Sequence, residues 1–221
     1  MKFDIKKKSG KARLGTLSLK HGVVHTPAFM TVGTYGSVKS LTNQDLHACN
    51  TEIILCNAYH LMIRPERNLI EKAGGLHKFM NWSKPILTDS GGYQVFSLSS
   101  QTKVSKDGVE FKSPLNGNKL FMSPEKSIET QLYLGSDIMM IFDECTPYPS
   151  SKIETEKSME LSLYWAEMSH KANNSKMPLF GIIQGGMYPD LREISLNELI
   201  KYDFEGYALG GLSVGEPDHL R

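Results

Sequence analysis

The sequence predicts an α/β fold in which a mainly parallel sheet is wrapped by helices. Short apolar runs that end abruptly at polar or glycine residues recur along the chain, and amphipathic helical patterns fill most of the intervals between them. The runs cover residues 53–59, 86–91, 138–145, 180–186 and 207–214. Each is typical of a buried parallel strand whose carboxyl end opens into a loop. A succession of such units fits either a doubly wound sheet or a barrel.

The helices between the strands have recognisable limits. Ser123 and Pro124 provide a cap and a first-turn proline, and Gly135 ends the apolar stripe that follows. Two further amphipathic helices are predicted over residues from about 152 to 173 and from 189 to 202. This alternation of helices and strands continues along the chain without a recognisable linker. A single domain over residues 1–221 is therefore expected.

Two regions interrupt the alternation. Residues 1 to about 45 are rich in Gly, Thr, Val and Ser with turn signals, and they predict antiparallel strands that precede the main body. Residues 101–122 contain the turn signals Asp107-Gly108 and Asn116-Gly117, which predict hairpins inserted after the second parallel strand.

Composition excludes several classes of protein. A chain of 221 residues with 40% apolar content can bury a core, which argues against disorder. The formal net charge of +1 argues against binding nucleic acid through bulk charge, so any RNA contact must come from local patches. One such patch is the basic amino-terminal stretch, although a lysine-rich terminus is often only solvated. Its basic residues are Lys2, Lys6, Lys7, Lys8, Lys11, Arg13 and Lys20.

The cysteines and the hydropathy pattern predict a soluble cytoplasmic protein. Cys49, Cys56 and Cys145 have neither the close spacing of a zinc site nor the even count of a disulfide framework, which fits a reducing compartment. No uninterrupted apolar run reaches the length of about 18 residues that spans a membrane, and the basic start lacks the apolar segment of a signal peptide.

Candidate functional residues follow the predicted strands, where loops carry function in barrels and open α/β sheets. A guanine-like base needs an acceptor for its N1–H and exocyclic amine, a donor for its carbonyl oxygen and an aromatic partner for its faces. Asp143 can accept, Gln184 and the Gly211 backbone can donate, and Tyr93 can stack. The second predicted strand ends in Asp89, Ser90, Gly91, Gly92 and Tyr93, the third in Asp143, the fourth in Gln184 and the fifth in Gly210 and Gly211.

Each of these residues taken alone has a simpler interpretation. An aspartate at a strand end often caps the next helix, a glycine pair is often only a turn, and a single loop tyrosine is often packing. The pairs Gly185-Gly186 and Gly210-Gly211 could equally cradle a phosphate. The joint occurrence of an aspartate, a tyrosine, a glutamine and glycine pairs at successive strand ends favours a base pocket.

A series of motifs resembles one family, the tRNA-guanine transglycosylases, or queuine tRNA-ribosyltransferases. The motifs are HTPAFMTVGTYGSVK from His25, NAYHLMIRPE from Asn57, DSGGYQVFSL from Asp89, GIIQGGMYPDLR from Gly181 and GYALGGLSVGE from Gly206. The resemblance implies a (β/α)8 TIM barrel with early antiparallel strands and an inserted hairpin region. About five of its eight units would be present in this chain.

The family resemblance also implies an activity. These pentosyltransferases replace guanine at the anticodon wobble position of tRNA with a 7-deazaguanine, in queuosine biosynthesis. By correspondence Asp89 is the proton acceptor, residues 89–93 line the base pocket, and Asp143, Gln184 and Gly211 hydrogen-bond the purine. Cys145 and Val214 resemble the bacterial type, whose incoming base is the aminomethyl precursor of queuine.

The resemblance also places some of the chemistry outside residues 1–221. The family's nucleophilic aspartate and its zinc ligands lie beyond that span, so the chain alone is expected to be inactive and to bind no metal, while the complete enzyme is expected to hold zinc. Implied partners are tRNA, guanine, the queuine precursor and a second copy in a homodimer. Two alternatives remain, a non-catalytic tRNA-binding accessory subunit and an unrelated sugar-phosphate-binding barrel enzyme.

Overall fold

The computed structural model describes residues 1–65, 67–98 and 102–221. The chain divides into two compact units, which are described separately. Unit 1 comprises Met1–Asp89 and Thr130–Met139, and unit 2 comprises Ser90–Glu129 and Met140–Arg221. The single catalytic domain expected over residues 1–221 stays a prediction.

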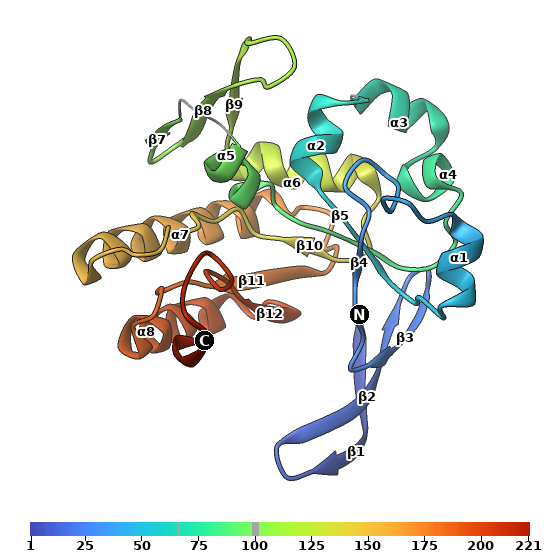
Figure 1. Ribbon diagram of the computed structural model, residues 1–221, viewed down its shortest axis with the longest axis horizontal. Helices are drawn as coiled ribbons and strands as arrows, with labels where there is room; N and C mark the ends of the chain where they lie inside the picture. The colour runs from blue at the N-terminus through green and yellow to red at the C-terminus, as the bar shows by residue number, and fades with distance from the viewer. Residues whose placement is uncertain (66, 99–101) are drawn as a thin grey trace. The chain divides into compact units, whose positions relative to one another are not determined.

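Unit 1 begins with the expected antiparallel strands. Strands β1 (Lys2–Ser9), β2 (Ala12–Leu19) and β3 (Gly22–Thr26) form one sheet, drawn in blue in Figure 1. The expectation of antiparallel strands up to about residue 45 is wrong for β4 (Thr31–Val32), because β4 pairs in parallel with β5 (Ile54–Cys56). The parallel sheet therefore starts one strand earlier than the apolar runs indicate.

The parallel sheet of unit 1 has the order β4-β5-β6, with β6 at Ile86–Thr88. Leu55 lies opposite Leu87, and Leu87 also forms a parallel bridge with Ile138. The short helices α1 (Asn43–Ala48), α2 (Ala58–Ile63), α3 (Arg67–Ala73) and α4 (Leu76–Met80) belong to the same unit. They pack with the strands around a core whose buried members include Leu46, Ile54, Leu61, Ile70, Trp82 and Ile86.

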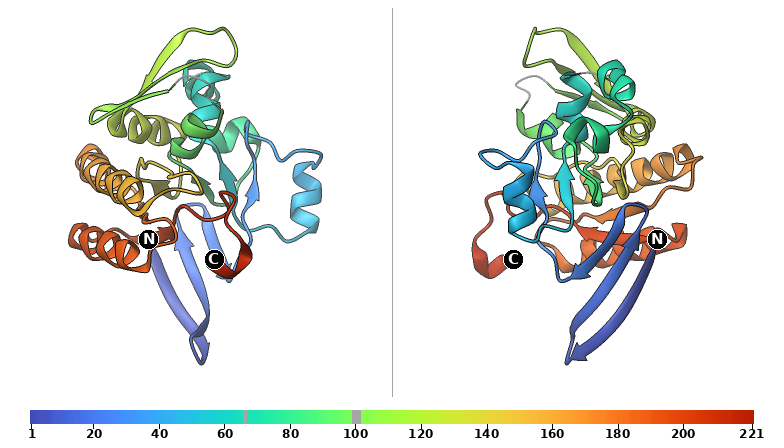
Figure 2. Two further views of the ribbon diagram at one scale, coloured as in Figure 1. Left: turned by 60° about the vertical axis from the view of Figure 1, so that its left-hand side comes forward. Right: turned by 90° about the vertical axis from the view of Figure 1, so that its right-hand side faces the viewer.

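Unit 2 contains the later strands and the longest helix. Strands β11 (Leu179–Ile183) and β12 (Gly206–Leu209) are parallel, and β10 (Met139–Met140) lies beside β11 in the sheet order. Helix α7 (Lys152–Ala172) begins at a capping box formed by Ser151 and Glu154. Helix α8 (Pro189–Leu199) continues into a 3₁₀ turn at Ile200–Tyr202 and lies beside α7 (Figure 2). These bounds confirm the two predicted amphipathic helices.

Residues 138–145, predicted as one strand, form a strand only at Met139 and Met140. After Ile141, whose N–H donates to Phe180, the backbone bonds to helix α7 and no longer to a neighbouring strand. The N–H of Phe142 donates to Ser169 Oγ at 3.1 Å, and that of Glu144 donates to Ser162 Oγ at 2.9 Å. Serine hydroxyls of helix α7 therefore take the place of strand-to-strand hydrogen bonds, and β10 ends earlier than predicted.

The predicted insertion is also present. Strands β7 (Lys103–Ser105), β8 (Gly108–Lys112) and β9 (Lys119–Met122) form an antiparallel sheet with turns at the expected glycines. The first residue of the predicted insertion, Gln101, lies outside the described residues. Helix α6 (Pro124–Leu134) starts after Ser123, whose Oγ accepts from Lys126 N, and it is followed by Gly135. Those limits confirm the predicted helix.

The mixed α/β class is confirmed, and the barrel is not. In the described parts of the chain each sheet has three strands, and no sheet closes on itself. No helix within those parts is both long and apolar enough to cross a bilayer.

Candidate active site

Three predicted site residues meet inside unit 2. The carboxylate of Asp143, a residue only 7% exposed, accepts from Gln184 Nε2 at 2.7 Å through Oδ2 and from Ser90 Oγ at 3.2 Å through Oδ1. Ser90 and Gln184 are themselves buried. A buried carboxylate is stable only when hydrogen bonds replace its lost hydration, and both contacts serve that need.

Neighbouring elements hold these side chains from behind. Ser90 Oγ also accepts from Gly92 N at 3.2 Å, and Ser90 O accepts from the hydroxyl of Ser127 in helix α6 at 2.6 Å. The backbone N–H of Gln184 donates to Ser195 Oγ of helix α8 at 3.1 Å. Helix α6 therefore bonds Ser90 and helix α8 bonds Gln184, the two residues that donate to Asp143.

Glycines are required around this pair. A β-carbon at Gly92 would overlap the backbone oxygen of Asp143 and lie 2.8 Å from its Oδ1. A β-carbon at Gly210 would lie 2.6 Å from Gln184 Nε2, and one at Gly211 would lie 2.8 Å from Gln184 Oε1. Gly211 also has a φ of +63°, which other residues adopt at a cost. Glycine at these positions therefore allows the backbone to lie close to Asp143 and Gln184, and its predicted close approach to a ligand stays a prediction.

One polar atom of the cluster is left without a partner. Gln184 Oε1 is buried and accepts no hydrogen bond from any described residue. An unpaired buried acceptor costs about 1–3 kcal/mol, so a ligand that supplies a donor would recover that free energy. The arrangement therefore presents an acceptor, Oε1, next to a carboxylate.

A cavity of about 390 Å³ lies in unit 2, and several of its lining residues are neighbours in sequence of Ser90, Asp143 or Gly211. Its walls come from helix α5 (Gly92–Leu98) and the loops after β10 and β12, and they are Tyr93, Phe96, Ser97, Glu144, Cys145, Thr146, Pro147, Ser213 and Val214. The volume is within the range of roughly 300–1,000 Å³ typical of small-molecule sites. Neither Asp143 nor Gln184 lines it, although Glu144 follows Asp143 directly.

Tyr93 lies on helix α5 and not in a loop, and it is 53% exposed. Gly211 lines a second, smaller cavity that shares Thr146, Pro147 and Val214 with the first. The predicted residues of unit 2 therefore divide between a buried hydrogen-bonding pair and the walls of adjoining cavities.

Charges and thiols beside the pair are strongly influenced by burial. Burial raises the pKa of Glu144, although a hydrogen bond with Ser158 partly offsets the rise. Burial, together with the carboxylates of Asp143 and Glu144, raises the pKa of Cys145 to about 12. Cys145 therefore remains a protonated thiol at neutral pH and is unsuited to act as a nucleophile.

Asp89 belongs to unit 1 and has its own support. It follows β6 and is half-buried. Its Oδ1 accepts from Ala58 N at 2.9 Å, and its Oδ2 accepts from Asn57 Nδ2. Asn57 follows β5 just as Asp89 follows the neighbouring β6, so the two side chains meet at the same end of the sheet. The carboxylate is held in one orientation by these two donors.

Supporting residues were not identified from the sequence. Asn57 orients Asp89, Ser127 holds Ser90, and Arg192 bridges two loops by donating to Gly186 O at 2.7 Å and Gly210 O at 3.0 Å. For Asn57 a signal existed, because it is a polar residue that interrupts the predicted apolar run at 53–59. Arg192 ends the motif quoted from Gly181, and Gly186 lies six residues before it. No local pattern marks Ser127, whose partner Ser90 lies 37 residues away.

Comparisons with known proteins agree with the resemblance of the motifs. The family model described as queuine tRNA-ribosyltransferase matches residues 7–221. Proteins named queuine tRNA-ribosyltransferase from Idiomarina loihiensis and Acinetobacter baylyi are each 56% identical over 98% of this chain. The alignments cover 58% and 57% of those two proteins, so the chain spans about three fifths of the length of these curated relatives. The chain belongs to the queuine tRNA-ribosyltransferase family, and its relatives are bacterial.

Proposed function

We propose that the protein containing this chain replaces guanine at the anticodon wobble position of tRNA with a 7-deazaguanine, as a pentosyltransferase of queuosine biosynthesis. The observation that carries the proposal is the buried pair of Asp143 and Gln184, in which Gln184 Oε1 has no partner among the described residues.

This pair complements the hydrogen-bonding edge of guanine. The N1–H and exocyclic amine are donors, and Asp143 and Gln184 Oε1 are neighbouring acceptors. The carbonyl oxygen of guanine needs a donor, which the second amide hydrogen of Gln184 or the backbone N–H of Gly211 can supply. Adenine has an acceptor at N1 and would face the carboxylate unfavourably. The site should therefore prefer guanine.

Asp89 is proposed as the proton acceptor, and Ser90, Gly91, Gly92 and Tyr93 as parts of the pocket wall. Support for this assignment comes from the two donors that orient Asp89 and from the bond that joins Ser90 to Asp143. Extruding a base from RNA costs a few kcal/mol, so a site with several oriented hydrogen bonds is needed to hold it. Tyr93 has the exposed ring that stacking on such a base requires.

The incoming base is proposed to be the aminomethyl precursor of queuine. Cys145 and Val214 both line the cavity next to the buried pair. Both side chains are small, and the adjacent Glu144 offers a carboxylate that can pair with an ammonium group on the ligand. The identity of the incoming base is a separate proposal from the choice of guanine as the leaving base.

Zinc, a homodimer and the (β/α)8 barrel form part of the proposal for the complete enzyme. The described residues contain a single group of three or more potential metal ligands, and none of the cysteines belongs to it. Cys49 is exposed, Cys56 is buried and Cys145 is half-buried. The residues present here do not fit a cysteine-rich zinc site, so no step is assigned to that metal.

Incorporation of labelled guanine into tRNA bearing a wobble guanine tests the proposal in the full-length protein. Wild type should incorporate label, and Asp89→Ala and Asp143→Ala should not. His25→Ala serves as a control because the exposed His25 pairs with the half-buried Glu52, outside the residues assigned to the site. Binding of tRNA without incorporation would instead indicate an accessory subunit and would overturn the proposal.

A further inference from the structure

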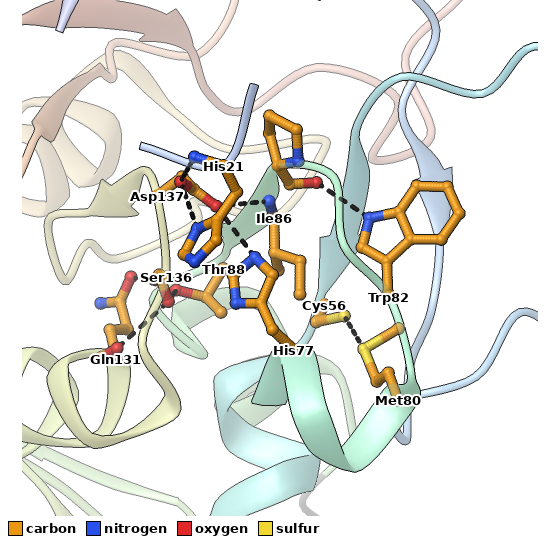
Figure 3. Close-up of polar contacts among 11 residues, drawn as sticks. His21, Cys56, His77, Met80, Trp82, Ile86, Thr88, Gln131, Ser136 and Asp137 are labelled. Atoms are coloured by element: carbon orange, nitrogen blue, oxygen red, sulfur yellow. Dashed lines mark hydrogen bonds and ion pairs between the residues drawn. The ribbon is translucent and has the colours of Figure 1, made fainter. Parts of the chain in front are cut away.

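Three polar residues from distant segments meet in unit 1, away from the residues assigned above. His21 comes from the turn between β2 and β3, His77 from helix α4, and Asp137 from the segment after helix α6. Figure 3 shows both imidazole rings directed at the one carboxylate. His21 Nδ1 lies 2.8 Å from Asp137 Oδ1, and His77 Nε2 lies 3.1 Å from Asp137 Oδ2.

The ligand atoms have spacings close to those of a metal site. One ring nitrogen from each histidine and one carboxylate oxygen all lie within 4.8 Å of one another. Zinc bonds of about 2.0–2.1 Å in tetrahedral geometry place neighbouring ligands about 3.3 Å apart, so no separation between ligand atoms has to shorten by more than about 1.5 Å. The two rings already stack, with centroids 3.7 Å apart and planes 27° apart.

The carboxylate is also held from behind, as metal-ligating carboxylates are. Asp137 Oδ2 accepts from Ile86 N at 2.9 Å, and Oδ1 accepts from His21 N at 3.1 Å. Burial raises the pKa of Asp137, but the hydrogen bonds from His77, Ile86 and His21 outweigh burial and keep its pKa below the ordinary value. The residue therefore carries a fixed negative charge at neutral pH.

Access to the cluster is possible through the histidines. The side chain of Asp137 is fully buried, whereas those of His77 and His21 are 14% and 28% exposed. An ion could therefore enter past His21 and complete its coordination with water. Each neutral imidazole would offer a lone pair once its proton resides on the other ring nitrogen, at Nε2 of His21 and Nδ1 of His77.

We propose that His21, His77 and Asp137 form a binding site for a divalent transition-metal ion of the zinc class. Two imidazoles and one carboxylate suit such an ion, whereas magnesium and calcium prefer oxygen ligands. A bound ion would cross-link the amino-terminal sheet, helix α4 and the segment before β10. The role inferred for the site is structural, and it is independent of purine exchange.

A second histidine in the chain provides a matched control. His25 Nδ1 lies 2.7 Å from Glu52 Oε1, and His25 N also donates to Glu52, which repeats the contacts between His21 and Asp137. No second imidazole joins that pair in the described residues. A generic histidine and carboxylate pair is therefore present without the third ligand.

Calorimetric titration of the metal-stripped chain with ZnCl2 tests the site. One equivalent should bind and raise Tm by about 5–10 °C at a concentration 100-fold above Kd. His21→Asn and His77→Gln place an amide nitrogen where the ligating ring nitrogen stood, so they preserve a donor to Asp137 but remove a ligand. Each should weaken zinc binding at least about tenfold, because loss of even an outer-shell partner costs 10–100-fold. His25→Asn should bind zinc like wild type.

Cobalt provides a readout that does not depend on variant folding. Co²⁺ bound by two imidazoles and a carboxylate should give visible absorption that Zn²⁺ displaces, and Mg²⁺ should not displace it. The proposal is overturned if wild type shows no such absorption and no zinc-dependent change in Tm. It is equally overturned if the double variant of His21→Asn and His77→Gln binds zinc with unchanged affinity.

Discussion

The two ends of β6 present carboxylates in opposite surroundings. At the amino end Asp137 is 1% exposed and accepts from Ile86 N and His21 N, and it lies 2.8 Å from His21 Nδ1 and 3.1 Å from His77 Nε2. At the carboxyl end Asp89 is half-buried and is oriented by Asn57 and Ala58. Because strand ends of one polarity carry function in α/β folds, we interpret the amino end as the stabilising end and the carboxyl end as the reactive one.

The largest expected difference is in stability. Asp137→Ala should lower the free energy of unfolding by about 3–5 kcal/mol, because it leaves buried donors without an acceptor. Asp89→Ala should cost about 1 kcal/mol, since removal of the half-buried carboxylate leaves space in which water can bond the two donors. Urea denaturation with chelator present measures both variants. Equal losses for the two would remove the distinction between the ends.

Alkylation of Cys56 tests whether solvent reaches the interior of the sheet at the carboxyl end of β5, next to Asp89. Cys56 lies opposite Thr88 in the sheet, and burial and then the charge of Asp89 raise its pKa to about 12. Its thiolate fraction at pH 8 is therefore about 10³-fold below that of an ordinary thiol. Because the raised pKa keeps the thiol protonated, the rate at which folded protein is alkylated at Cys56 should rise about tenfold per pH unit up to pH 10.

Mass spectrometry of alkylated protein compares the cysteines within one sample. Exposed Cys49 should label readily at pH 8, whereas Cys56 should label only after denaturation. Rapid labelling of Cys56 in the folded chain would show that the sheet beneath Asp89 is open to solvent.

A positioning role for Asn57 is the third expectation. Asn57→Ala should lower kcat/KM for guanine exchange by about 10–100-fold in the full-length protein, because Asp89 loses a donor that fixes its orientation. Stability should change little. Asn43→Ala is the control, since the Asn43 amide bonds Met80 O and Asn81 O and lies outside the proposed site. Unchanged exchange by Asn57→Ala would contradict the role.

A smaller effect than at Asp137 is expected at Thr88, the last residue of β6. Thr88 Oγ1 donates to Gln131 Oε1 at 3.0 Å and lies 2.6 Å from Ser136 Oγ, as Figure 3 shows. Thr88→Val should cost about 1–2 kcal/mol of stability because it removes a buried hydroxyl that bonds Gln131 and contacts Ser136, whereas Thr88→Ser should recover most of the loss. Thermal unfolding of the two variants would show the difference, and identical Tm values would argue against it.

Local signals in the sequence predicted most of the elements. Ser123, Pro124 and Gly135 specify the limits of helix α6 because caps and breakers act within one turn. The apolar runs located β5, β6 and β11, since burial on both faces requires continuous apolar residues. The run at 207–214 also located β12, but its predicted burial is wrong, because Tyr207 and Leu209 are exposed. The two-residue strand β4 is too short to form an apolar run, so it was not predictable. The early end of β10 was not predictable either, because serines of helix α7 bond the backbone that follows it.

The sequence predicted which types of residue take part in the candidate site, but not which of these residues contact one another. Asp143 and Gln184 were both expected to bind a purine, yet their bond to each other joins residues 41 positions apart. The bond between His21 and Asp137 joins residues 116 apart, and nothing near either residue in the sequence indicates it. Residue types reveal which donors and acceptors exist, whereas strand register decides which of them meet.

Purine selectivity tests the central claim most directly. Equilibrium binding of guanine and adenine should be measured by calorimetry for the wild-type chain and for Asp143→Ala. The account predicts that guanine binds wild type at least about tenfold more tightly than adenine and that the variant loses this preference, because one mismatched bidentate edge costs about 1–3 kcal/mol. Equal affinity of wild type for the two purines, or an undiminished preference in Asp143→Ala, would contradict it.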